Sequence, residues 1–460
     1  MLERLPPKTT AAVAIFVALL FGLHLLPGLN WVRTPTSGTA SAILRDRAPA
    51  RLPDAPPIIA EPLEPTKPKS GEPRHLPTKP DVVSTPGVPR VSDPSGALIR
   101  FFGALRRTEA GQGPPLRILH YGDSPTTADS ITGDVRTLLH RRYGNGGHGF
   151  LLIAKPWAWY GHRGVNLRAE GWTSEAASAP TRAKDKLHGL GGVSFTAYPG
   201  AYSIAKLPDN DHRRVEVQYL GQPGGGDFQV EADELVVASV RTAQDSKAPG
   251  FLAADLPVGT SSVKLVVKRG MVRLFGWTFE RGGPGVVYSS IGLNGASVQT
   301  VVNYFDEVQW AEQLQHQKPD LLVLNYGSNE SVNAVYVDKY YEVELRKLVA
   351  RVQRALPQTS ILVMSPMDRG QRDSKGDIVT VPTVPRIVEI QQRVSLDAGC
   401  AFFNTYAAMG GAGTMGQWYA AKPKLVSADF LHPTPGGAAK VGALLDEALR
   451  EVYGRWKAAR

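Results

Sequence analysis

The feature that most constrains the fold is a series of apolar runs without polar alternation, each followed by a helix-compatible stretch. Strands that are apolar on both sides are typical of a parallel sheet covered by helices on both faces. We expect such strands at 117–122, 286–292, 320–327, 360–366 and 400–406, and helices at 128–143, 298–317, 339–356, 384–396 and 435–452. The sequence therefore predicts an α/β fold with a five-stranded parallel sheet flanked by helices.

A long interruption separates the first two strands of this pattern. Between 161 and 285 the runs are short, alternate between polar and apolar residues, and are separated by glycine-rich turns. This pattern is typical of an antiparallel β-sandwich. We predict an inserted β-sandwich at 161–285, with 97–160 and 286–460 forming the parallel-sheet domain.

Aromatic side chains in the insert are candidates for stacking on sugar rings. They are Trp172, Tyr198, Tyr202 and Trp277. For any one of them, packing in the core of the sandwich is the favoured interpretation.

The N-terminal region, residues 1–32, is predicted to be a signal anchor or a signal peptide. Residues 9–32 contain no Asp, Glu, Lys or Arg, and this stretch is long enough to span a bilayer. Arg4 and Lys8 precede it. Small residues at 40–42 offer a cleavage site, but they lie well beyond the apolar run, so the anchor is favoured. Either interpretation means that the rest of the protein is exported.

Residues 33–96 are rich in proline and poor in large apolar side chains. Such a segment cannot bury enough apolar surface to offset its ordering entropy, so we expect a disordered linker. Cys400 is the only cysteine, which excludes an intramolecular disulfide, and its apolar neighbours predict a buried thiol.

Candidate catalytic residues follow the predicted strands. Ser124 in Gly-Asp-Ser follows the first strand, Gly295 follows the second, and Asn329 follows the third. The carboxyl ends of parallel strands form one edge of a sheet, which is where functional residues gather. Near the C-terminus, Asp429 and His432 lie three residues apart. A serine hydroxyl is a weak nucleophile that needs a base, an orienting carboxylate and oxyanion donors, and these residues offer all three.

Each block also has a simpler interpretation. Asp123 could cap the next helix, Asn294–Gly295 and Asn329 could be ordinary turn residues, and His432 could be a loop residue before the last helix. All four blocks in order favour catalysis.

In this order the four blocks resemble those of the SGNH (GDSL-type) hydrolase superfamily. The longer stretches HYGDSPTTADSITGDVR, AAMGGAGTMGQW and ADFLHPTPGG, with the insert directly after the first block, resemble peptidoglycan O-acetylesterases. The likeness covers the chain from about Leu98 onward. It implies a flavodoxin-like sheet domain and an insert similar to a carbohydrate-binding jelly roll.

The resemblance also implies a role for each residue. Ser124 would attack an ester carbonyl, His432 would act as general base, and Asp429 would orient and stabilise the imidazolium. The oxyanion would be held by the Ser124 N–H, the Gly295 N–H and the Asn329 side-chain amide. Pro125 departs from the residues that many relatives carry there. Because the expected donor is the N–H of Ser124 itself, this departure concerns substrate fit more than chemistry.

Other functional classes have weaker support. We expect no cofactor and no metal, since no His, Cys, Asp or Glu pair has a metal-ligand spacing and a serine hydrolase needs none. The glycine runs match neither a P-loop nor a dinucleotide fingerprint. The net charge of +10 is scattered along the chain without a nucleic-acid-binding motif, so an anionic envelope polymer is a better partner than nucleic acid.

The sequence therefore predicts an exported serine esterase that removes O-acetyl groups from a cell-envelope polysaccharide, peptidoglycan first. The expected location is the bacterial periplasm or cell envelope, with residues 9–32 anchored in the inner membrane. A polysaccharide O-acetyltransferase with the same triad, or a catalytically silent wall-binding protein, are the alternatives.

Overall fold

A seven-stranded sheet forms the centre of residues 91–460, the part of the chain that the computed structural model describes. Its order is β1 (Val91–Ser92), β20 (Ala401–Phe403), β17 (Ser360–Met364), β16 (Leu321–Asn325), β2 (Leu116–Gly122), β15 (Val286–Gly292) and β3 (Asn145–Gly147). Neighbouring strands are parallel except β1 and β20, which are antiparallel.

The sheet has seven strands where the sequence predicted five. The five expected strands form its middle, and the additional strands, β1 and β3, lie at its edges. β1 has two residues and β3 reads Asn-Gly-Gly, so neither carries the apolar run that marked the others.

The edge strand β1 also corrects the expected end of the linker. Val91 pairs with Phe403, and the Asp93 carboxylate accepts hydrogen bonds from the N–H groups of Ala97 and Leu98 at 2.6 and 3.1 Å. Residues 91–96 therefore belong to the sheet domain. The remainder of the predicted linker and the predicted anchor or signal at 1–32 lie outside the described residues.

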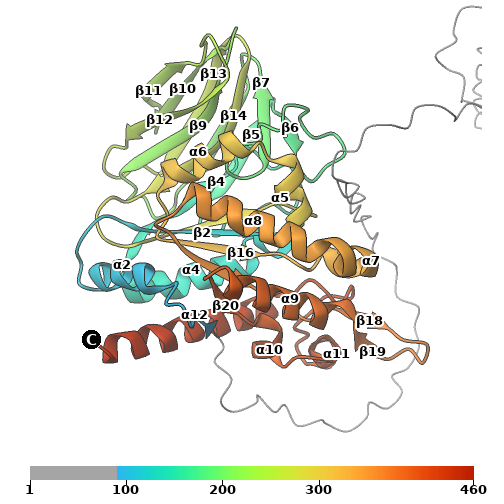
Figure 1. Cartoon of the computed structure of the whole chain (residues 1–460). Helices are drawn as coiled ribbons and strands as arrows, with labels where there is room; N and C mark the ends of the chain where they lie inside the picture. Colours follow the sequence, from blue (N-terminus) through green and yellow to red (C-terminus); the bar gives the residue numbers. More distant parts are fainter. Residues whose placement is uncertain (1–90) are drawn as a thin grey trace, which may run out of the picture. The chain divides into compact units, whose positions relative to one another are not determined.

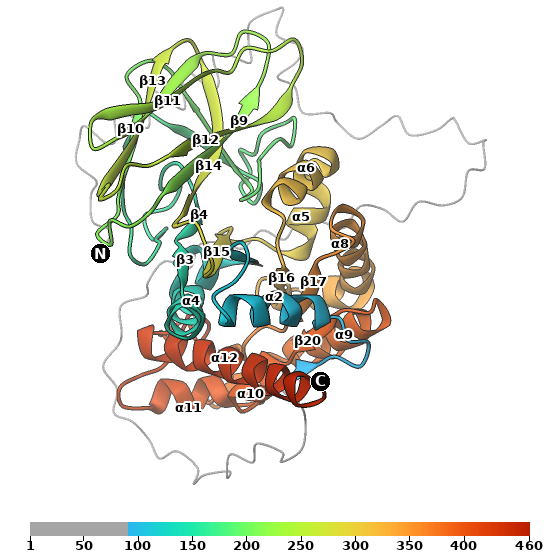
Figure 2. The same ribbon diagram turned by 90° about the vertical axis from the view of Figure 1, so that its left-hand side faces the viewer.

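Helices cover both faces of the sheet. One face carries α2 (Ile99–Glu109), α4 (Ser130–Tyr143) and α12 (Pro435–Ala458), which lie side by side in Figures 1 and 2, and the other carries α5 (Val298–Tyr304), α6 (Glu307–Gln317), α8 (Glu342–Ala355) and α9 (Thr383–Asp397). Successive residues of β2 point to opposite faces: Ile118 packs with the first group and Leu119 with the second. Both are only 1 % exposed, which explains why the strand is apolar without alternation.

One expected helix is interrupted, and another begins slightly later than expected. The helix predicted at 128–143 is α4, which begins at Ser130 because Asp129 has a left-handed backbone and separates it from the short helix α3 (Ser124–Thr127). The predicted helix 298–317 is divided into α5 and α6 because Asp306 is extended and its side chain accepts the N–H of Gln309. The remaining short elements are η3 (Glu330–Val332), α7 (Ala334–Tyr336), η4 (Val337–Tyr341), β18 (Gly370–Arg372), β19 (Ile378–Thr380), α10 (Thr405–Met409) and α11 (Thr414–Ala420).

The segment between β3 and β15 forms two antiparallel sheets. One contains β11 (Leu235–Arg241), β10 (Asp227–Ala232), β13 (Ser262–Arg269), β8 (Tyr202–Lys206) and β5 (Asn166–Glu170); the other contains β12 (Ala248–Asp255), β9 (Arg214–Gly221), β14 (Val272–Glu280), β7 (Val193–Ala197), β6 (Thr173–Ala176) and β4 (Gly149–Leu151). The sheets meet through Tyr219 of β9 and Phe228 of β10, whose rings pack edge to face. β4 precedes residue 161, so the second sheet begins earlier than the sequence indicated. The jelly-roll topology stays a prediction.

The inserted sheets share buried contacts with the seven-stranded sheet and its helices. The Tyr121 hydroxyl donates to the Leu190 carbonyl and accepts from the Trp310 indole N–H. The Gly189 N–H donates to the Gln309 side chain. All described residues fall within one compact unit. Within residues 91–460, no helix combines the length and apolar character needed to cross a bilayer.

Candidate active site

Ser124 lies at the sharp passage from β2 to α3. β2 ends at Gly122, and α3 starts at Ser124 with Pro125 in its first turn, where a missing N–H costs nothing. The N–H groups of Thr126 and Thr127 donate to the Asp123 carbonyl at 3.1 and 2.9 Å. This turn leaves Ser124 partly exposed between two buried residues.

His432 and Asp429 reach this serine from a closed loop before α12. The loop is held by the bond from the Ser427 N–H to the His432 carbonyl and by the bridge between Val426 and Pro433. The Ser124 Oγ and His432 Nε2 atoms are 2.7 Å apart, and His432 Nδ1 and Asp429 Oδ2 are 2.6 Å apart. The structure thus joins the three residues in one relay of hydrogen bonds.

The electrostatics of this relay favour an ionised carboxylate beside a basic imidazole. Burial alone would raise the pKa of Asp429, but hydrogen bonds from the His432 ring and from the His432 and Leu431 N–H groups lower it to about 2. The hydrogen bond to Asp429 raises the pKa of His432, against the opposing effect of burial. The arrangement can accept a proton from Ser124 and stabilise the resulting imidazolium.

Gly292, the last residue of β15, and Gly295, three residues later, are glycines for different structural reasons. Gly292 packs directly on α3, where an added Cβ would lie 2.0 Å from the Thr127 nitrogen. Gly295 has a φ of +69°, and an added Cβ would meet nothing within 4 Å. Gly295 is therefore the one in open space, where a ligand oxygen can approach its backbone.

Asn329 lies in the turn after β16 and is 9 % exposed. Its amide nitrogen donates to the Ala296 carbonyl at 2.7 Å and lies 3.5 Å from Asp123 Oδ2, the upper limit for a hydrogen bond. One amide N–H is thus engaged by the loop that carries Gly295, while the other is weakly held and available to a ligand.

The chain is similar to a known protein family and to solved structures. Residues 267–440 match the GDSL-like lipase/acylhydrolase family. This range contains Gly295, Asn329, Asp429 and His432, and it does not include Ser124. The chain contains a GDSL-like hydrolase domain. The predicted resemblance to SGNH hydrolases is confirmed, as is the prediction of an SGNH ester hydrolase.

One solved structure shows the same fold. A peptidoglycan O-acetylesterase matches with a TM-score of 0.68 at 20 % identity, over 80 % of this chain and 99 % of that chain. A family two carbohydrate esterase from Clostridium thermocellum, solved with cellohexaose, matches with a TM-score of 0.27 at 12 % identity, over 63 % and 99 % of the two chains. The second likeness is too distant to inform the site. No curated protein sequence matches the chain.

Two charged residues near the Ser124 relay have roles that the sequence did not indicate. Asp123 is 3 % exposed and does not cap α3 with its side chain; burial raises its pKa to about 6. Arg369 donates to the Ser328 carbonyl at 2.8 Å, and its charge acts on both Asp123 and Asp429. Asp123 belonged to a recognised motif, whereas nothing in the sequence around Arg369 marks it.

Glu330 is a further residue that the sequence analysis missed. It is fully buried, and its two carboxylate oxygens accept the N–H groups of Val298 and Gly327 at 2.8 and 3.0 Å. Burial raises its pKa to about 7. The side chain therefore ties the start of α5 to the turn that carries Asn329.

Residues from the inserted segment hold the loop of Gly295. The Ser178 hydroxyl donates to the Asn294 carbonyl at 2.6 Å, and the Trp159 indole N–H donates to the Asn294 side chain at 3.2 Å. Trp159 is 54 % exposed, so its ring borders the open side of this loop. Neither residue belongs to a recognised motif of the hydrolase domain.

The four aromatic candidates of the insert have different environments. Trp277 is fully buried, as the core interpretation predicted, and Trp172 is partly buried with its indole N–H donating to the Tyr202 carbonyl. Tyr202 is partly buried, and Tyr198 is 65 % exposed. Only Tyr198 of the four has a largely free surface.

The site is open rather than enclosed. The side chains of His432 and Asp429 are 41 % and 31 % exposed. A cavity of about 280 Å³ is lined by residues such as Arg117 and His316, and one of about 300 Å³ by residues such as Asp129 and His162; neither is lined by the Ser124 relay. The site can thus admit one group of a larger molecule.

Proposed function

We propose that the protein is an exported serine esterase that removes O-acetyl groups from a cell-envelope polysaccharide, peptidoglycan first. The observation that carries the proposal is the relay from Ser124 Oγ to His432 Nε2 and from His432 Nδ1 to Asp429, at 2.7 and 2.6 Å. A serine activated by an oriented imidazole at the surface of a GDSL-like domain is suited to acyl transfer.

The mechanism would proceed through an acetyl-enzyme. His432 takes the proton of Ser124 as its oxygen bonds to the acetyl carbon, and the imidazolium then returns a proton to the departing sugar oxygen. A water molecule attacks the acetyl-enzyme with His432 again as base, which releases acetate and restores Ser124. Asp429 remains ionised and stabilises the imidazolium in both steps.

The negative oxygen of each tetrahedral intermediate would be held by the Ser124 N–H, the Gly295 N–H and the second amide N–H of Asn329. The left-handed backbone and open surroundings of Gly295 and the weak contact between Asn329 and Asp123 support these roles. Each such donor contributes about 3–4 kcal/mol to transition-state stabilisation.

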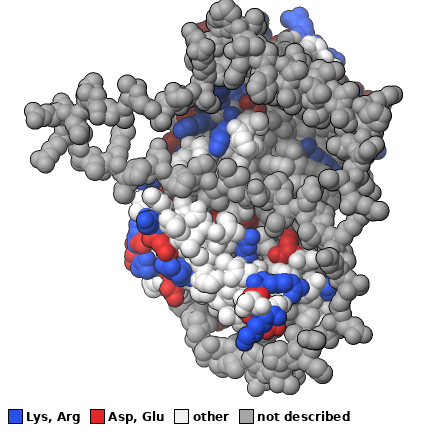
Figure 3. All heavy atoms as spheres, turned by 90° about the vertical axis from the view of Figure 1, so that its right-hand side faces the viewer, with Lys and Arg blue, Asp and Glu red and all other residues white. Residues whose placement is uncertain are grey.

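A polymeric substrate is supported by the open site and by the fold shared with a peptidoglycan O-acetylesterase. The net charge of +10 is weaker support for an acidic polymer as substrate than the open site and the shared fold. Where described residues are visible in Figure 3, Lys and Arg lie beside Asp and Glu instead of forming one basic surface. Arg346, for example, pairs with both Glu342 and Asp397. We therefore assign recognition to contacts near the ester, not to overall charge.

For location, we propose the bacterial periplasm or cell envelope, with residues 9–32 holding the chain in the inner membrane. This proposal rests on the apolar sequence of these residues, which lie outside the described part. Membrane fractionation of cells expressing the full chain, with and without a carbonate wash, tests it.

The function is tested by acetate release from O-acetylated peptidoglycan by the full chain. Wild-type protein is expected to release acetate, and base-treated peptidoglycan without O-acetyl groups should give none. Ser124→Ala should reduce the rate by about a millionfold, to background, while circular dichroism stays unchanged. Residual turnover within about tenfold of wild type would contradict the nucleophile assignment.

Product analysis separates the alternatives. If acetyl groups pass to a sugar hydroxyl and free acetate does not accumulate, the protein is an O-acetyltransferase with the same relay. If wild type and Ser124→Ala both bind the polymer and neither releases acetate from any ester, the protein is a silent wall-binding protein.

A further inference from the structure

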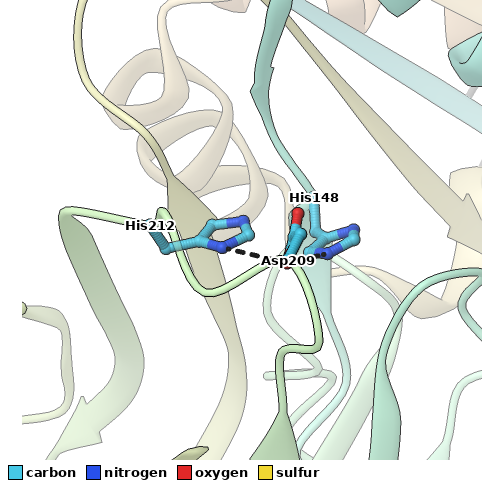
Figure 4. A group of neighbouring side chains, drawn as sticks. All are labelled: His148, Asp209 and His212. Atoms are coloured by element: carbon cyan, nitrogen blue, oxygen red, sulfur yellow. Dashed lines mark hydrogen bonds and ion pairs between the residues drawn. The ribbon is translucent and has the colours of Figure 1, made fainter. Parts of the chain in front are cut away.

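A cluster of two histidines and one carboxylate lies outside the hydrolase site. His148 is the single residue between β3 and β4, and Asp209 and His212 belong to the loop between β8 and β9. Asp209 Oδ1 lies 3.4 Å from His148 Nε2 and 3.5 Å from His212 Nδ1, and the three atoms lie within 4.8 Å of one another. Figure 4 shows the carboxylate between the two imidazole rings.

His212 has unmet hydrogen-bonding capacity. Its side chain is fully buried, and within the described residues neither ring nitrogen has a hydrogen-bond partner, because the 3.5 Å contact with Asp209 lacks hydrogen-bond geometry. Buried polar groups in native proteins are almost always paired, and leaving one unpaired costs about 1–3 kcal/mol.

The neighbouring Arg281 orients Asp209 but leaves the atoms that face one another in the cluster free. Arg281 donates to Asp209 Oδ2 at 2.6 Å, which leaves Oδ1 directed at the histidines, and its other terminal nitrogen pairs with Asp211 at 2.6 Å. A third buried imidazole, His162, packs edge to face against His148. Carboxylates that ligate a metal are usually held by a second hydrogen bond of this kind.

The chemistry of the cluster fits a transition-metal ion. Two imidazoles and one carboxylate are ligands that Zn²⁺ accepts, whereas Ca²⁺ and Mg²⁺ require mainly oxygen. Tetrahedral Zn²⁺ with ligands at about 2.0–2.2 Å places ligand atoms roughly 3.3–3.5 Å apart. The two contacts of Asp209 Oδ1 already have these lengths.

We propose that His148, Asp209 and His212 bind a zinc-class ion that joins the inserted sheets to the seven-stranded sheet, with water as the fourth ligand. β3 belongs to the seven-stranded sheet and β4 to an inserted sheet, so His148 stands where the chain leaves one for the other. The chain returns beside it, since the Arg281 N–H donates to the Gly146 carbonyl at 2.8 Å. The role of the ion is therefore to stabilise this junction, independently of the reaction at Ser124.

The test measures metal binding and thermal unfolding of the full chain, without a polyhistidine tag and after treatment with a chelator. We expect about one zinc per chain by mass spectrometry after dialysis. Zinc at a hundredfold excess over its dissociation constant should raise the unfolding temperature by several degrees. Cobalt(II) should give the visible absorption of a tetrahedral site.

Variants distinguish this site from adventitious binding. His148→Gln and Asp209→Asn should lose both the zinc and the thermal shift, while His316→Gln, which alters an imidazole paired with Glu216 elsewhere, should keep both. His212→Ala is expected to behave like the first two. If His212→Ala fails to fold, the test rests on the conservative Asp209→Asn variant and on the number of zinc ions bound per wild-type chain. Wild type without bound zinc and without a thermal shift, or equal binding by all variants, would overturn the proposal.

Discussion

At the scale of single residues, the site contains two carboxylates: Asp429, whose pKa is lowered, and the buried Asp123, whose pKa is raised. Asp429 touches the imidazole of His432, whereas Asp123 acts on it through charge. Both negative charges raise the pKa of His432. Because only neutral His432 can accept the serine proton, these charges determine the pH at which the enzyme becomes active.

The pH dependence of hydrolysis follows from this. The value of kcat/KM for a small acetyl ester should rise with pH through a midpoint above 6.5, the ordinary pKa of histidine, because the pKa of His432 is raised. Asp123→Asn removes one negative charge and should shift the midpoint to lower pH. The control is Asp134→Asn, which alters a carboxylate of α4 that pairs with Arg163. A midpoint unchanged in Asp123→Asn would mean that Asp123 acts only through packing.

Asn329→Ala tests the oxyanion site. Removing the amide should lower kcat by about a hundredfold or more with little change in KM, because the amide binds charge that develops only in the transition state. Val332→Ala, three residues later and 55 % exposed, is the control. A change confined to KM would assign Asn329 to substrate binding instead.

At the scale of elements, the inserted sheets support the loop of Gly295. Ser178 and Trp159 both bond to Asn294, so the position of the Gly295 N–H depends on chain segments outside the seven-stranded sheet and its helices. Excision of the insert would also uncover Tyr121 and Trp310, which are 1 % exposed. Point variants therefore probe this coupling better than deletion.

Ser178→Ala removes one hydrogen bond of the loop, worth about 1 kcal/mol. We expect kcat for a small acetyl ester to fall by up to about tenfold, with KM and the unfolding temperature nearly unchanged. Ser174→Ala, an exposed serine of β6, should leave kcat as in wild type. A purely structural role for Ser178 would instead lower the unfolding temperature and leave kcat intact.

At the scale of the whole molecule, the domain begins earlier than its apolar pattern indicated. Val91 is 3 % exposed in the edge strand β1, and Asp93 binds the N–H groups just before α2. The folded part therefore includes residues 91–96.

A chain that begins at residue 97 should accordingly be less stable than one that begins at residue 85. Losing the buried Val91 side chain and the Asp93 contacts should lower the free energy of unfolding by about 2–4 kcal/mol, measured by urea denaturation. Asp93→Ala in the longer chain isolates the share of the Asp93 hydrogen bonds, about 1 kcal/mol. Equal stability of both fragments would show that β1 adds nothing to the sheet.

The sequence by itself determined the elements whose signal is local. Buried parallel strands are apolar throughout, so β2, β15, β16, β17 and β20 were recognisable, and with them the residues that follow their carboxyl ends. Edge strands are short and partly solvated, so β1 and β3 carried no such signal. The break between α5 and α6 was missed because one capping aspartate outweighed the helical periodicity around it.

Only the tertiary structure decided which distant residues meet. Ser124 and His432 are 308 positions apart, and their contact depends on strand order and on the loop before α12. Arg369 and Glu330 become site residues only because turns from different strands converge at one sheet edge. His148 lies 61 positions from Asp209, a separation that no local ligand spacing reveals. Strands and helices form according to the residues near them in the sequence, whereas contacts between them depend on the packing of the whole chain. The sequence motifs could therefore be recognised, but the distant residues that contact them could not.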